Sequence, residues 1–105
     1  MTSIPQNITR LIEIGERAIE AYEMEQKRKA AYETLIAAWQ SWKDERGIAR
    51  VVKNSPEWKQ MQESADDEYS DFCLARDVQL NAERRLSAAI TRHFRKGGDL
   101  ADEHP

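Results

Sequence analysis

The chain is poor in the residues that make loops and cross-links. Its 105 residues include four glycines, three prolines and one cysteine. So few turn formers leave few places for loops, and long helices are therefore expected. The single cysteine, Cys73, cannot form a disulfide within one chain, which favours a reducing compartment.

The sequence also lacks targeting signals and long apolar runs. Its first residues, MTSIPQNITR, have no basic segment followed by an apolar one, the pattern of a secretory signal. No apolar run approaches the roughly 20 residues that span a bilayer. We therefore predict a cytoplasmic protein that makes no membrane contact.

Residues for catalysis are scarce. The two histidines are His93, which lies among basic residues, and His104; no glycine-rich phosphate loop is present. Carboxylate pairs at helical spacing, such as Glu13 with Glu16, suit hard cations, as in the Mg²⁺ sites of all-α nucleotide pyrophosphohydrolases. Charged helices also produce such pairs by chance. We expect no enzyme activity, no catalytic residues, no metal and no cofactor.

The first half of the chain has the periodicity of one long helix. We predict a helix over about 3–47, roughly 60 Å long, with Pro5 in its first turn. A break near Gly15 or within residues 23–29 stays open. The apolar residues recur at alternating steps of three and four. They form a main stripe of Ile4, Ile8, Leu11, Ala18, Tyr22, Tyr32, Ile36 and Trp39, and a second stripe of Ala31, Leu35, Ala38 and Trp42.

The second half predicts another helix, over about 56–96, after a turn over about 48–55. Asn54 or Ser55 is its expected N-cap, and the glycines at 97 and 98 are expected to end it. The domain would then span 1–98, with a polar tail over 99–105. The main stripe of this helix is Trp58, Met61, Ala65, Phe72, Ala75, Ala82, Leu86 and Ala89, flanked by Tyr69, Cys73, Leu80, Ile90 and Phe94.

The charges predict how the two helices pair. Each predicted helix is acidic in its first half and basic in its second half. An antiparallel pairing places acidic halves beside basic ones, whereas a parallel pairing places like charges together. Single surface pairs contribute little stability, so the pattern mainly selects orientation. The sequence predicts an all-α fold, a long antiparallel helical hairpin.

The apolar faces are wider than one pair of helices requires. Each predicted helix has two adjacent apolar stripes, and Trp39 and Phe72 are expected to be buried in the main ones. Either the first helix breaks and folds over the second, or two hairpins pair as a dimeric four-helix bundle. The sequence leaves both arrangements open.

Five carboxylates lie within one ten-residue segment of the second predicted helix. This acidic run, ESADDEYSDF at 63–72, contains Glu63, Asp66, Asp67, Glu68 and Asp71. Carboxylates four residues apart on a helix lie about 6 Å from each other, close to the spacing of phosphates along a nucleic-acid strand. The run is either a solvated helix face or a surface that binds a basic protein, and we take these five residues as the candidate partner-binding site.

A non-enzymatic, protein-binding function follows from these features. An acidic helix face can occupy a basic groove meant for phosphates, so we expect an inhibitor of a nucleic-acid-handling complex. By analogy of class, small phage anti-defence proteins, anti-CRISPR proteins among them, share this size and character. The alternatives are a structural coiled-coil component, or a nucleic-acid-binding protein that uses the basic end of the second helix, although direct binding is disfavoured by a sequence pI of about 5.4. That basic end comprises Arg84, Arg85, Arg92, Arg95 and Lys96.

Overall fold

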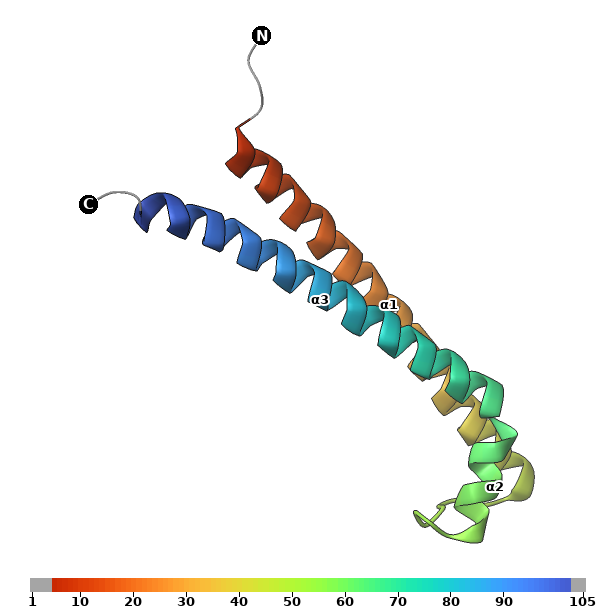
Figure 1. Ribbon diagram of the computed structural model, residues 1–105. Coiled ribbons are helices and arrows are strands. Elements are labelled where there is room, and N and C mark those ends of the chain that lie inside the picture. The colour runs from red at the N-terminus through yellow and green to blue at the C-terminus, as the bar shows by residue number, and fades with distance from the viewer. Residues whose placement is uncertain (1–4, 103–105) are drawn as a thin grey trace. The chain divides into compact units, whose positions relative to one another are not determined.

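The protein is built from helices (Figure 1). A computed structural model describes the backbone of residues 5–102 and the side chains of residues 5–95. The helices are α1 (Gln6–Arg46), α2 (Pro56–Ser64) and α3 (Asp66–Asp102), and these described residues contain no strand. The predicted all-α fold is confirmed, and α1 packs on α3.

The helix α1 is continuous over 41 residues, so neither Gly15 nor residues 23–29 break it. The carbonyl of Pro5 accepts its first hydrogen bonds, from the N–H groups of Ile8 at 3.1 Å and Thr9 at 3.2 Å. At the other end Gly47 adopts a left-handed φ of 65°. Two hydrogen bonds close this end, from Gly47 N to Asp44 O at 3.2 Å and from Ile48 N to Lys43 O at 2.9 Å. This is the Schellman motif, in which glycine is favoured because it has no Cβ.

The helix α2 begins with the side-chain cap that the sequence indicates. Ser55 is the N-cap, and its Oγ accepts a hydrogen bond from the N–H of Trp58 at 3.2 Å. Pro56 follows in the first helical position, where a missing N–H costs nothing. The preceding Asn54 has a φ of 67°, which asparagine tolerates better than most residues. The start predicted at residue 56 is therefore confirmed.

The predicted single helix over 56–96 is wrong, because the chain breaks between α2 and α3. Ala65, at the junction, has a φ of −115° and a ψ of 33°, outside helical values. Its N–H bonds to the carbonyl of Gln62 at 3.2 Å, a tighter turn than an α-helix makes. The hydroxyl of Ser64 donates to the carbonyl of Met61 at 2.6 Å. Such bonding of a serine back to its own helix competes with the backbone ladder and bends helices.

The predicted stop at the two C-terminal glycines is also wrong. The helix α3 continues through Gly97 and Gly98 to Asp102. Glycine lowers helix stability but retains an N–H and a carbonyl for the ladder, so it permits a helix to continue. The predicted residues 3 and 4 of the first helix, and residues 103–105 of the predicted tail, lie outside the described part of the chain.

The chain divides into two compact units. The first contains Met1–Met24 and Val78–Pro105, and the second contains Glu25–Asp77. In the first unit, Arg85 bonds Glu20 at 2.7 Å and Arg92 pairs with Glu13. An earlier residue of α1 thus meets a later residue of α3, so the two segments are antiparallel. In the second unit the rings of Tyr32 and Phe72 lie 5.5 Å apart.

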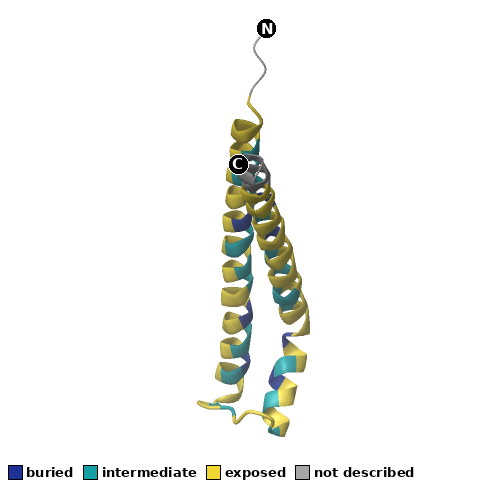
Figure 2. Cartoon of the chain, turned by 60° about the vertical axis from the view of Figure 1, so that its left-hand side comes forward, coloured by how far each residue is buried: buried dark blue, intermediate teal, exposed yellow. Residues whose placement is uncertain are grey.

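Buried and half-buried side chains follow a heptad pattern on the sides of the helices that face each other (Figure 2). They recur at alternating steps of three and four, as in a coiled coil. We call these residues the seam. In α1 the seam is Ile14, Arg17, Ala21, Met24, Arg28, Ala31, Leu35, Ala38 and Trp42; in α2 and α3 it is Trp58, Met61, Ala65, Glu68, Phe72, Ala75, Gln79, Ala82, Leu86, Ala89 and His93.

The main stripe predicted for the second helix coincides with the seam, whereas the one predicted for α1 does not. Of that stripe, Leu11 is 51% exposed and Tyr22 62% exposed, whereas Leu35 and Trp42 of the second stripe are 1% and 5% exposed. The predicted burial of Trp39 and Phe72 is only partly met, since both are half-buried. The bulkier stripe of α1 thus lies outside the seam, in which alanine is the commonest residue.

Candidate partner-binding surface

The acidic run lies across the junction of α2 and α3. Glu63 is in α2, and the other four carboxylates are in the first turns of α3. Carboxylates near a helix N-terminus interact favourably with the helix dipole, which accounts locally for their place in α3. The α3 carboxylates do not all point the same way, however. Glu68 occupies a seam position and is half-buried, whereas Glu63, Asp66, Asp67 and Asp71 are exposed.

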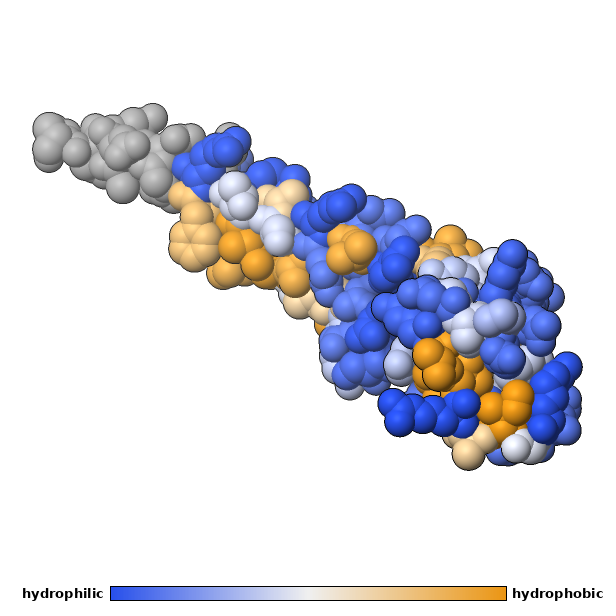
Figure 3. All heavy atoms as spheres, turned by 90° about the horizontal axis from the view of Figure 1, so that it is seen from below, coloured by the Kyte–Doolittle hydropathy of each residue, from blue (hydrophilic) through white to orange (hydrophobic). Residues whose placement is uncertain are grey.

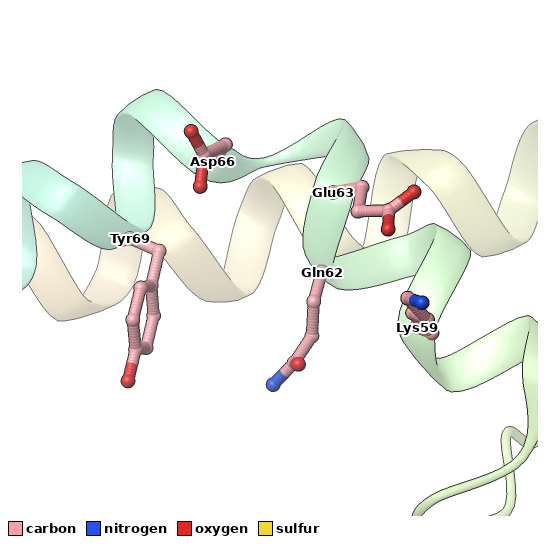
Figure 4. A pocket seen from close by; sticks show the side chains of 5 residues that line it. All are labelled: Lys59, Gln62, Glu63, Asp66 and Tyr69. Carbon is pink, nitrogen blue, oxygen red and sulfur yellow. The ribbon is translucent and has the colours of Figure 1, made fainter.

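The junction forms a hollow of about 300 Å³. Lys59, Gln62 and Glu63 line it from α2, and Asp66 and Tyr69 line it from α3 (Figure 4). The structure thus brings together two of the five predicted site residues, Glu63 and Asp66. The sequence analysis did not include Lys59 and Gln62 in the site, because it selected carboxylates alone, although Gln62 and Lys59 lie four and seven residues before Asp66 and so share its side of a helix.

The exposed carboxylates of the acidic run form no ion pairs with other described residues. Other acids of the chain do pair: Glu20 with Arg85, and Glu25 with Lys29 at 3.4 Å. The basic half of α1 therefore does not neutralise this run by direct contact. Its negative charge remains available to an outside cation or a basic surface.

The basic end predicted for the second helix lies in α3 and is partly neutralised, as the opposite charges of antiparallel helices predict. Arg85 and Arg92 pair with Glu20 and Glu13 on α1. Arg84 donates to the side-chain oxygen of Asn81 at 3.4 Å. Two of the arginines that could contact phosphates are thus already bound to carboxylates, which weakens this end as a nucleic-acid site.

Neither a cluster of metal ligands nor a helix able to cross a membrane occurs in the described part of the chain. No group of three or more histidine, cysteine, aspartate or glutamate side chains is placed to hold a metal ion within that part of the chain. None of the described helices has an apolar segment long enough to span a bilayer. Cys73 is a free thiol and is half-buried.

Large apolar side chains remain exposed on α1. Figure 3 shows hydrophobic patches among hydrophilic surface on one face of the molecule. Within residues 5–24 the exposed apolar side chains of α1 share one side of the helix, away from the seam. We call this side the outer strip of α1: Ile8, Leu11, Ile12, Gly15, Ala18, Ile19 and Tyr22. The sequence pattern marked part of this strip as apolar, but the interpretation assigned it to the core.

Comparison of the chain with protein-family models, with curated proteins and with solved structures found no match.

Proposed function

We propose that this chain is a non-enzymatic, cytoplasmic protein that binds another protein through the exposed carboxylates of the acidic run. The observation that carries the proposal is the clustering of exposed carboxylates that form no ion pair with the described residues. Glu13 and Glu20 form ion pairs within the fold, whereas Glu63, Asp67 and Asp71 are exposed and form none with the described residues. An unneutralised cluster of one sign attracts a surface of the opposite sign and speeds association with it.

The partner we propose is a basic protein surface that normally holds phosphates. Carboxylates on adjacent turns of a helix resemble a row of phosphates in charge and spacing. The chain would then act as an inhibitor of a nucleic-acid-handling complex, the class of role that small phage anti-defence proteins, including anti-CRISPR proteins, perform. This assignment rests on an analogy of class, supported by the charge and size of the chain.

A structural coiled-coil role is the second candidate, and the heptad pattern of the seam favours it. Direct nucleic-acid binding remains a weaker alternative, because Arg85 and Arg92 are engaged by carboxylates. With either protein-binding role we propose self-association into a dimeric bundle, since large apolar side chains such as Ile19 and Tyr22 are each 62% exposed.

Charge reversal tests the acidic run. The triple variant Glu63→Lys, Asp67→Lys, Asp71→Lys removes attraction to a basic partner and adds repulsion. If each reversal costs about 1 kcal/mol of binding free energy, capture should weaken by about a hundredfold. The measurement is affinity capture from cell lysate with quantitative mass spectrometry, alongside thermal melting followed by circular dichroism.

The matched control is Glu16→Lys, Glu23→Lys, Glu33→Lys. These three carboxylates are exposed, form no ion pair with the described residues, and change the net charge by the same amount. We expect the control to capture the same proteins as the parent, and both variants to melt near the parent temperature. Equal capture by both variants would refute the proposed surface. It would also be refuted if the variant of Glu63, Asp67 and Asp71 melts at a lower temperature while its folded fraction binds normally.

A further inference from the structure

The loop between α1 and α2, residues 47–55, carries cations that the fold does not neutralise (Figure 1). Arg50 and Lys53 lie in this loop, and Lys59 follows in α2. All three side chains are exposed, and none forms an ion pair with the described residues. Residues 43–59 contain five basic and three acidic side chains, although the net charge of the chain is −3. This segment is therefore positive within an acidic protein.

A hollow of about 400 Å³ lies beside these cations. Its lining residues are Asn54, Ser55, Pro56, Trp58 and Lys59. Trp58 is half-buried, so part of its indole ring remains accessible from the hollow. A volume of this size is at the small end of the range of ligand sites. The hollow thus combines a flat apolar wall with a cationic side chain.

An aromatic wall beside several cations matches the chemistry of a nucleotide unit. Nucleic-acid bases stack on tryptophan whatever their sequence, and lysine and arginine attract the phosphates between them. Glu57 is exposed in the same segment, but it does not line the hollow. A membrane surface fits less well, because residues 47–59 expose a single large apolar side chain, Val52.

We propose that the hollow at Trp58 binds one base of a single-stranded nucleic acid, while Arg50, Lys53 and Lys59 contact its phosphates. The positive charge of these three side chains complements the strand, and no described carboxylate competes for them through an ion pair. No residue of this site belongs to the acidic run or to the basic end of α3. The inference therefore stands independently of the proposed function and goes beyond it.

Fluorescence anisotropy with a labelled oligothymidylate of about ten nucleotides tests the cations. We expect the parent to bind at about 50 mM salt, and the association constant to fall with about the second power of salt concentration. Three phosphate contacts on a single strand predict this slope, since each adds about 0.7 to the exponent. The variant Arg50→Glu, Lys53→Glu, Lys59→Glu should bind at least about a hundredfold more weakly.

The matched control is Lys27→Glu, Arg84→Glu, Arg95→Glu. These three cations are exposed, form no ion pair with the described residues, and change the net charge by the same amount. The control should bind within about threefold of the parent, because salt screens charges that do not touch the strand. A parent that does not bind, or equal losses of affinity in the two variants, would overturn the site.

The contribution of the ring is measured with the parent and a strand of equal length that lacks bases. We expect this abasic strand to bind about tenfold more weakly than the oligothymidylate, the loss of one stacked base. Trp58→Phe should keep the difference and Trp58→Leu should remove it, with circular dichroism reporting the folded fraction of each. Equal binding of the two strands by the parent would overturn the base site. Vesicles of phosphatidylserine that capture the parent while the oligothymidylate does not would assign the cations to a membrane and also overturn it.

Discussion

Replacing Leu35 with alanine is expected to lower the free energy of unfolding by about 2–5 kcal/mol. Leu35 is 1% exposed and is the largest fully buried side chain among the described residues. Truncation removes methyl groups from a packed site and leaves a cavity, so the loss exceeds the transfer free energy of the atoms alone. Urea denaturation followed by circular dichroism, at one protein concentration, measures the change.

The neighbouring residue provides the control. Ile36 carries as many carbon atoms as Leu35 but is 40% exposed and lies outside the seam. We expect Ile36→Ala to cost about 1 kcal/mol or less, because less of its apolar surface leaves water on folding. Equal losses of unfolding free energy for the two variants would contradict the seam position of Leu35. The sequence alone had assigned Ile36 to the main stripe and Leu35 to the second stripe.

Enlarging Ala82 should also destabilise the fold. Ala82 is 0% exposed at a seam position of α3. A leucine there has no space unless the helices move apart, and overpacking of this kind costs about 1–3 kcal/mol or more. Differential scanning calorimetry of Ala82→Leu should therefore give a lower melting temperature than that of the parent.

Ala88→Leu is the matched substitution on the same helix. Ala88 is exposed, so a leucine there meets solvent and keeps a high helix propensity. Its melting temperature should stay near that of the parent. If Ala82→Leu melts like Ala88→Leu, then α1 and α3 do not pack closely at Ala82.

The sequence predicted the ends of helices where a few neighbouring residues specify them. Ser55, Pro56 and Gly47 each specify a helix end through their own geometry, and the structure has helix ends at all three. The break at Ala65 was missed, although the hydroxyl of Ser64 beside it bonds back to the carbonyl of Met61. A serine within a helical pattern does not reveal whether its hydroxyl bonds back to its own helix. The acidic run was therefore predicted on one helix and lies across two.

The sequence by itself determined that the chain is helical, that its charges favour antiparallel pairing, and which stripe of α3 faces a neighbour. Only the tertiary structure decided which stripe of α1 joins it. Ranking by hydrophobicity selects the stripe with Leu11 and Tyr22, whereas the seam contains Ala21 and Arg28. Small side chains let two helices approach closely, and the stem of an arginine can pack while its head reaches polar groups. Which face of α1 packs against α3 depends on how closely the two helix surfaces fit each other. That fit exists only when both helices are present.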